Sequence, residues 1–137
     1  MTELFAFGKE ILENQAFSRL LGTELLLFEE GKAELGLLIR EELKQQHGFV
    51  HGGVISYLAD NCLTYAGGSV LGNSVTAEYK INYLRPAKGE RLLARASIIY
   101  AGASQATCEC KIYVINNSEE KLVAVAQGTI NKVNYKM

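Results

Sequence analysis

The sequence has few of the residues that build disulfide frameworks or metal sites. Its three cysteines, Cys62, Cys108 and Cys110, are odd in number, form no Cys-x-x-Cys pair and lie near no histidine cluster. Neither a disulfide framework nor a zinc site is therefore expected, and no metal site is predicted. Cys108 and Cys110 alternate within a predicted strand, so both are expected to point to one face as small hydrophobic side chains.

Clusters of one charge and long apolar runs are also absent. Fourteen basic and fifteen acidic residues give a net charge of -1 without a cluster of Lys or Arg. This balance argues against nucleic acid or an anionic membrane as the main partner. No apolar run approaches the roughly 18 residues that span a bilayer, and the first residues lack the pattern of a signal peptide. We expect a cytoplasmic protein. The charge balance does not exclude a small anionic ligand.

The composition is that of one domain. The chain has 137 residues, of which 48% are apolar, and it shows no internal repeat, low-complexity tract or linker. Residues 1–137 are therefore predicted to form a single compact domain with a substantial core.

The first half of the chain contains two segments of helical spacing. Apolar residues over 3–22 predict a short amphipathic lead-in with a break near Asn14, and those over 54–71 predict one long helix. Between them, leucine-rich segments at 24–29 and 32–40 flank a Glu-Gly pair, which predicts a hairpin.

The second half changes to the period-two alternation of strands. Short turn signals separate four such segments, and connections this short join antiparallel neighbours. The predicted strands cover residues 74–84, 91–101, 105–116 and 122–133. The sequence therefore predicts an α+β domain in which a four-stranded meander follows the long helix.

The faces of these strands differ. In the first strand, Val75 and Tyr79 alternate with Thr76, Glu78 and Lys80, so one face is predicted to be apolar and the other polar. The later strands carry apolar residues on both faces, and such sheets must be covered on both sides. We expect the long helix to cover one face and a second copy of the chain to cover the other.

The most informative segment is His51-Gly52-Gly53, followed at fixed spacing by Asp60. Paired glycines let the backbone turn tightly and let a ligand approach, and the free amides of a helix N-terminus stabilise negative charge. Asp60 lies two turns inside the helix, where an amphipathic pattern favours an apolar residue. The segment predicts an anion-binding helix end with a candidate acid-base carboxylate. The alternative is a glycine-rich loop entering a core helix, with Asp60 facing solvent or bonded to a neighbouring strand.

The chain resembles the PaaI-like (phenylacetic-acid-degradation) acyl-CoA thioesterases in three motifs, which occur in the family's order: His51-Gly52-Gly53, Leu58-Ala59-Asp60 and Ile81-Asn82-Tyr83-Leu84-Arg85-Pro86-Ala87. The resemblance covers residues 15–133, nearly the whole domain. It implies a hotdog fold, in which an antiparallel β-sheet wraps around a long central α-helix. It also implies hydrolysis of acyl-CoA thioesters with aromatic or short- to medium-chain acyl groups. Coenzyme A is part of the substrate, and no separate cofactor is expected.

The resemblance further implies roles for individual residues. Asp60 would be the general base or the nucleophile, and the backbone amide of Gly52, helped by Gly53, would hold the thioester carbonyl oxygen. Thr76 matches the place of a hydroxyl residue that helps to position water. Gln45 matches a position usually occupied by asparagine and keeps the amide on a longer side chain.

Four residues are predicted to contact the substrate or to shape its approach: His51, Arg85, Lys88 and Gly102. The ring of His51 would tie the approach loop to backbone carbonyls. Family members often have a basic residue directly after the glycine that corresponds to Gly102, where this chain has alanine. Arg85 and Lys88 are therefore the candidate cations for the phosphates of coenzyme A.

The spacing of the two catalytic elements predicts a shared site. Gly52 and Asp60 are eight residues apart, about 12 Å along a helix axis, so they cannot easily act on one carbonyl group. If they cooperate, the oxyanion donors of one subunit must meet the carboxylate of the other, which predicts an isologous homodimer. A homotetramer built from two such dimers is the expected assembly.

Two other functions remain open at this stage, because fold alone does not settle function. A hotdog hydratase or dehydratase generally pairs a histidine with a carboxylate, and no histidine follows Asp60. A non-catalytic acyl-CoA-binding module is the second alternative. Release of free thiol from acyl-CoA would distinguish these functions from hydrolysis.

Overall fold

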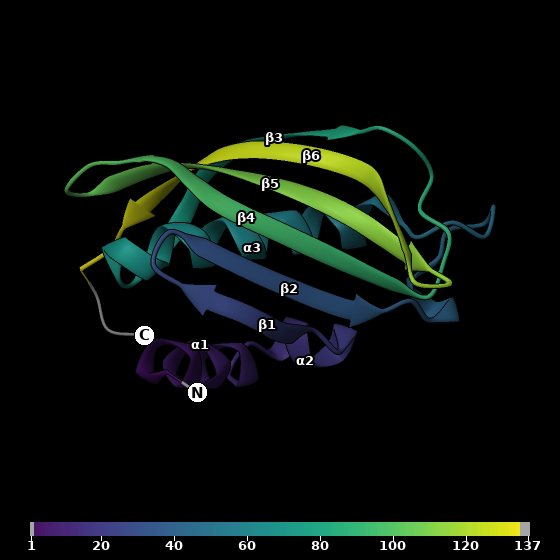
Figure 1. Ribbon diagram of the computed structural model, residues 1–137, viewed down its shortest axis with the longest axis horizontal. Helices are drawn as coiled ribbons and strands as arrows, with labels where there is room; N and C mark the ends of the chain where they lie inside the picture. Colours follow the sequence, from purple (N-terminus) through teal and green to yellow (C-terminus); the bar gives the residue numbers. More distant parts are fainter. Residues whose placement is uncertain (1, 135–137) are drawn as a thin grey trace.

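The computed structural model describes residues 2–134. A six-stranded antiparallel sheet curves around the long helix α3 (Gly52–Leu71), and two N-terminal helices lie beside the edge strand β1 (Figure 1). These helices are α1 (Glu3–Glu13) and α2 (Ala16–Leu21), and a short 3-10 turn, η1 (Glu41–Leu43), precedes α3. The strands are β1 (Glu24–Glu29), β2 (Lys32–Leu38), β3 (Ser74–Tyr83), β4 (Arg91–Ala101), β5 (Gln105–Asn116) and β6 (Glu119–Lys132). This arrangement confirms the α+β hotdog fold.

The order of the strands, β1-β2-β4-β5-β6-β3, corrects the predicted meander. β4, β5 and β6 are joined as consecutive hairpins, but β3 pairs with β6 and forms an edge of the sheet. β3 and β4 are three strand positions apart, about 14 Å at the usual strand spacing. The extended connection 84–90 is long enough to cross that distance, so a short connection did not require β3 and β4 to be neighbours.

The central helix packs its apolar stripe against the concave face of the sheet. Leu58, Cys62 and Leu63 of α3 are fully buried. Gly67 lets the helix approach β6, because a Cβ atom at this position would lie 2.8 Å from Cβ of Ile130. Cys108 and Cys110 are also buried with free thiols, as the sequence predicted.

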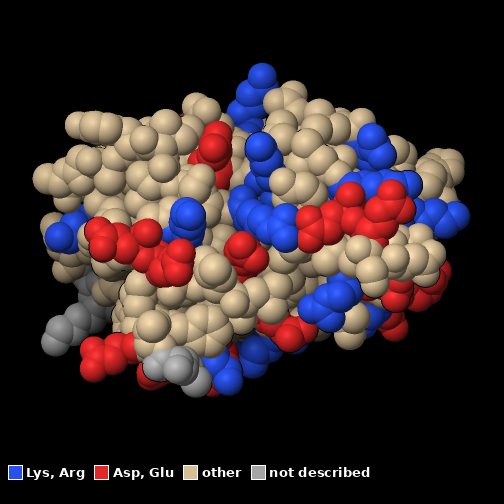
Figure 2. Space-filling view, in the orientation of Figure 1, with Lys and Arg blue, Asp and Glu red and all other residues tan. Residues whose placement is uncertain are grey.

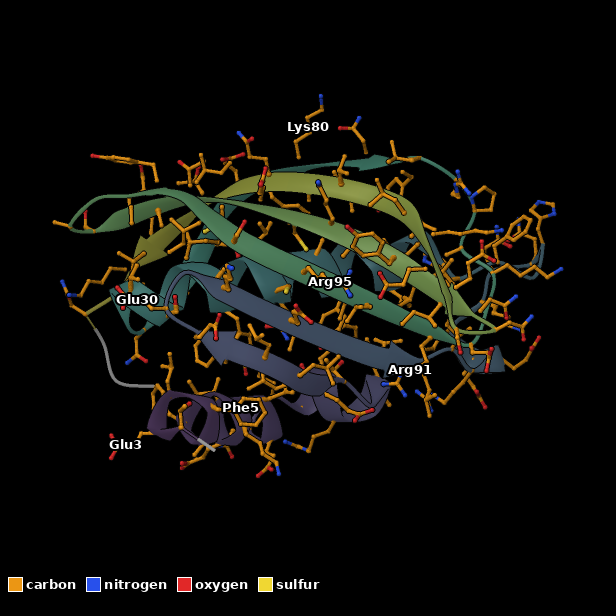
Figure 3. All side chains as sticks on the ribbon, in the orientation of Figure 1. Glu3, Phe5, Glu30, Lys80, Arg91 and Arg95 are labelled. Carbon is orange, nitrogen blue, oxygen red and sulfur yellow. The ribbon has the colours of Figure 1, made fainter. Side chains whose placement is uncertain are left out.

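A β-bulge in β3 changes the predicted distribution of its side chains. The register with β6 shifts between Thr76 and Glu78, which leaves Ala77 as the extra residue. Thr76 therefore faces α3 on the same side as Tyr79, whereas Glu78 accepts a hydrogen bond from Thr129 outside. The shared face predicted for Thr76, Glu78 and Lys80 is wrong, and Figure 3 shows Lys80 projecting away from α3.

The outer face of the sheet is polar along its centre. Arg95 in β4 pairs with Glu120 at 2.8 Å and with Glu34 at 3.7 Å, and Figure 2 shows charges of both signs interspersed on this side. Leu93 lies opposite Tyr113 of β5 and is already buried within the chain. Leu93 is therefore covered by its own strand neighbours, whereas Ile99 of the same strand is 52% exposed. Cover of this face by a second copy of the chain stays a prediction.

Candidate active site

The N-terminus of α3 is capped by His51. Its backbone is extended, with φ -60 and ψ 134, and its Nδ1 accepts a hydrogen bond from Gly53 N–H at 2.8 Å. The carbonyl of His51 accepts from the amides of Val54 and Ile55, at 3.0 and 3.5 Å. Among residues 2–134 no group accepts from Gly52 N–H. The helix therefore presents one free amide, and the ring of His51 stabilises the loop through an amide rather than through the predicted carbonyls.

The two glycines differ in how much space the chain leaves for a side chain. A Cβ at Gly53 would lie 3.0 Å from Nδ1 of His51, so a side chain there would crowd the capping ring. A Cβ at Gly52 would meet the Tyr83 ring at 3.5 Å, an ordinary contact. The chain itself thus leaves room for a side chain at Gly52. Because Gly53 N–H already has an acceptor, the expected help from Gly53 in holding an oxyanion is not available in this arrangement.

Asp60 lies on the side of α3 that faces β3 and is half-buried. Thr76 donates a hydrogen bond from its hydroxyl to Oδ1 of Asp60 at 2.5 Å. The described part of the chain supplies no donor to the other oxygen, Oδ2. The hydrogen bond from Thr76 alone does not distinguish a catalytic Asp60 from a structural one, because a structural Asp60 was also expected to bond to a neighbouring strand. It is the open second oxygen that leaves this carboxylate able to act on a water molecule or a carbonyl carbon.

Thr64 is a site residue that the sequence interpretation missed. Its hydroxyl lies 2.7 Å from Oγ1 of Thr76 and 2.9 Å from the carbonyl oxygen of Asp60. The spacing of four from Asp60 places it one turn further on the same face, which was the signal that could have found it. Thr64 and Thr76 together hold the carboxylate in one orientation.

A polar stripe runs along the face of α3 that contacts β3. It consists of Gly52, Ser56, Asp60 and Thr64, which follow one another at intervals of four. Their partners on β3 are Tyr83, whose hydroxyl donates to the Gly52 carbonyl, Tyr79, whose hydroxyl bonds to Ser56, and Thr76. Gly52 and Asp60 therefore share a face, yet they remain about 12 Å apart along the axis.

The other predicted site residues divide into two groups. Gln45 and Arg85 line one hollow with Gly52 and Tyr83. The side-chain oxygen of Gln45 accepts from the backbone amide of His47, so it closes its own turn.

Lys88 lines a separate hollow, which it shares with Lys44. Gly102 lies in the β4–β5 turn, at the opposite end of the sheet from the start of α3 (Figure 1). The structure therefore brings Gln45 and Arg85 to the free amide but not Lys88 or Gly102.

The cysteines and other metal-ligating groups do not add to this site. Burial raises the pKa of Cys62 and raises that of Cys108 to about 11, so both thiols are protonated at neutral pH. Among residues 2–134 no three His, Cys, Asp or Glu side chains gather to hold a metal ion. Within the same range, no helix has the length and apolar character needed to cross a membrane.

The chain is similar to known proteins in family, in sequence and in structure. The family described as the thioesterase superfamily matches residues 47–121, which include α3 and the Asp60 site. A putative esterase of Archaeoglobus fulgidus is 32% identical over 123 residues, which cover 89% of this chain and 78% of the relative. The acyl-coenzyme A thioesterase PaaI of Escherichia coli is 28% identical, with 88% of this chain and 85% of that protein covered.

Solved structures agree with these relatives. A thioesterase family protein from Silicibacter pomeroyi has a TM-score of 0.86 and 30% identity, and covers 89% of this chain and 92% of its own. Escherichia coli PaaI has a TM-score of 0.85 and 26% identity, over 96% and 97% of the two chains. The fold and the matched residues define a thioester hydrolase. The chain belongs to the thioesterase superfamily and is similar to its PaaI-like members.

Proposed function

We propose that the protein hydrolyses acyl-CoA thioesters in sites shared by two subunits. Asp60 supplies the carboxylate, and Gly52 of the partner subunit supplies the oxyanion donor. One observation carries the proposal: a free amide and a carboxylate with one open oxygen lie on the same face of α3, two turns apart. The name of the relative PaaI, an acyl-coenzyme A thioesterase, supports coenzyme A as the carrier of the acyl group.

The chemistry follows from where charge develops. Attack on the thioester carbonyl turns its oxygen negative, and one preorganised backbone donor such as Gly52 N–H lowers the barrier by about 3 to 4 kcal/mol. Asp60 uses Oδ2 to take a proton from the attacking water, or it attacks the carbonyl carbon itself to give an anhydride that water then opens. The C–S bond breaks, and the coenzyme A thiolate leaves and takes up a proton. Thr76 and Thr64 keep Oδ2 aimed at the substrate throughout.

A two-fold axis near Ser56 would join the two groups. Ser56 is midway between Gly52 and Asp60, so antiparallel α3 helices that cross there bring each amide to the other subunit's carboxylate. The open edge of β3 supports this arrangement, because β3 pairs with β6 on one side only and an exposed edge strand is a template for pairing. Ser56 bonds to Tyr79 in the middle part of β3, so self-pairing of β3 around Tyr79 would place the axis correctly. A tetramer of two such dimers stays a prediction.

Arg85 is the cation best placed for coenzyme A. Its side chain borders the hollow that contains Gly52, and it is exposed at the end of β3. A phosphate group there would lie outside the reacting carbonyl and would orient the pantetheine arm toward it. Lys88 is assigned no such role, since it borders a different hollow.

Asp60→Asn tests the proposed function. We expect its release of free thiol from acyl-CoA to fall by about 10²- to 10⁴-fold, the range associated with a lost acid-base group. Thr76→Val should lower turnover less, by roughly 10-fold or more, because it removes one hydrogen bond to a charged group. Circular dichroism and thermal unfolding should show that both variants fold.

Measurements on the Asp60→Asn variant and on the wild-type protein decide between hydrolysis and the two alternative functions. Near-normal turnover in a folded Asp60→Asn variant would remove Asp60 from the mechanism. Saturable binding of acyl-CoA by the wild type without thiol release would favour a binding module, and addition of water to an enoyl-CoA would favour a hydratase.

A further inference from the structure

An apolar groove lies between α1 and the C-terminal half of α3, directly beside the Asp60 site. Its walls include Leu4, Phe7 and Ile11 of α1, and its floor includes Phe28 and Tyr65. None of its lining residues is charged. We name it the α1–α3 groove.

The groove belongs to the packed structure rather than to a loose surface. α1 runs antiparallel to α3, because Tyr65 donates from its hydroxyl to the Gly8 carbonyl at 2.8 Å and Asn61 donates to the Gln15 side chain at 3.0 Å. The rings of Phe28 and Tyr65 meet edge to face, with centroids 5.1 Å apart. These contacts, at the Asn61 end and in the middle of the groove, hold the two helices together.

One end of the groove meets the Asp60 site. Gln15, Asn61 and Thr64 border one end, and Thr64 lies 2.7 Å from the Thr76 hydroxyl that donates to Asp60. Beyond that end lie the apolar walls, and the far end beside Gly72 is bordered by Leu4 together with the polar residues Asn73 and Ser74. The apolar walls suit an acyl group, which has a polar carbonyl at one end and an apolar tail. A thioester carbon held at Asp60 would therefore direct its tail past Thr64 into the groove.

The length of the groove limits the tail. From Thr64 to Gly72 the helix advances about 12 Å, and an extended chain advances about 1.2 Å per bond. The groove thus accepts a chain of about ten bonds. We propose that the α1–α3 groove binds the alkyl tail of the substrate and that the enzyme prefers straight acyl groups of about eight to ten carbons. This inference rests on the proposed function for the position of the thioester.

A chain-length series tests the groove. We expect kcat/KM for saturated acyl-CoAs to rise about two- to fourfold per added methylene, because the groove buries apolar surface. The rise should stop near ten carbons, and octanoyl-CoA should exceed benzoyl-CoA. Phe7→Glu, which places a carboxylate among the apolar walls, should lower the ratio of kcat/KM for decanoyl- over butanoyl-CoA at least about tenfold. Phe7→Leu, which keeps an apolar side chain at this position, should leave the ratio near the wild-type value.

Phe17→Glu is the matched control. Phe17 is 55% exposed on α2, close to the 52% of Phe7 on α1, and it does not line the groove. The same substitution should therefore leave the decanoyl to butanoyl ratio at the wild-type value. Calorimetric binding of decanoate provides a readout that needs no hydrolysis, and we expect Phe7→Glu but not Phe17→Glu to abolish it.

The outcomes separate the groove from the proposed function. Hydrolysis with a flat chain-length series, a preference for benzoyl-CoA, or equal effects of the two glutamate variants would overturn the groove and leave the hydrolase intact. Decanoate binding that Phe7→Glu abolishes, in a protein that releases no thiol, would keep the groove and overturn the proposed function. If Phe7→Glu instead changes only the subunit number measured by light scattering, the groove holds a second copy of the chain and the acyl assignment is wrong.

Discussion

Replacing Gly52 with proline would delete one N–H group from the candidate site and change little else. Gly52 is the first residue of α3, the helical position at which proline is favoured because its missing N–H has no partner there. The residue before a proline must be extended, and His51 already is, with φ -60 and ψ 134. The Cβ atom also fits, since it would meet the Tyr83 ring at 3.5 Å.

The expected loss follows from the number of donors. Gly52 N–H is the one amide of the first turn without an acceptor among residues 2–134, and removal of a single oxyanion donor costs about 3 to 4 kcal/mol, or 10²- to 10³-fold in kcat. Gly52→Ala is the matched control, because it adds a similar Cβ and keeps the N–H. We expect Gly52→Pro to lose about 10²- to 10³-fold in thiol release with unchanged thermal unfolding, and Gly52→Ala to lose much less.

Mixed dimers then test whether the site is shared. In a heterodimer of one Gly52→Pro chain and one Asp60→Asn chain, one site combines the intact amide of the second chain with the intact carboxylate of the first. Purified heterodimers, selected with two affinity tags, should therefore recover about half of the wild-type activity, and random mixtures about a quarter. Both parent proteins alone should stay inactive.

Two results would refute this reasoning. Full activity in a folded Gly52→Pro protein would show that another group holds the carbonyl oxygen. Heterodimers as inactive as their parents would show that the amide and the carboxylate do not meet across subunits.

Three further predictions concern assembly and stability. Ser56→Cys should form a disulfide with its own copy on oxidation, seen on non-reducing gels, while Ser69→Cys on the same helix should not, because only the residue midway between donor and carboxylate lies on the axis. Gly67→Ala should lower the free energy of unfolding in urea by about 1 to 3 kcal/mol, since its Cβ would lie 2.8 Å from Ile130; an unchanged value would contradict the close packing. Burial raises the pKa of Cys108 from 9.0 to about 11, so its contribution to stability is present below pH 9 and declines between pH 9 and 11. Urea titrations should show a smaller alkaline loss in Cys108→Val than in the wild type.

The local structure of this protein was predicted well from the sequence. The break near Asn14, the first hairpin, the long helix and the strand segments were predicted because each depends on spacing between near neighbours. β6 starts three residues earlier than expected, at Glu119, since the tight turn with positive φ at Asn117 and Ser118 lets pairing begin at once.

Site residues were found where local pattern and chemistry coincide. The glycine pair and Asp60 belong to one helix, so their spacing could be turned into a distance without the fold. Thr64 was missed although it is one turn from Asp60, because a threonine on a helix has many unremarkable uses. Its role depends on Thr76, which arrives from another strand.

The sequence by itself determined that a helix would begin at paired glycines, that a carboxylate would lie two turns inside it, and that strands would follow, because these properties depend on residues close in the chain. Only the tertiary structure decided that β3 lies at the sheet edge beside β6, that a bulge turns Thr76 inward to Asp60, and that His51 uses the amide of Gly53. Those facts depend on pairings between distant segments, where a shift of one residue moves a side chain to the other face of the sheet.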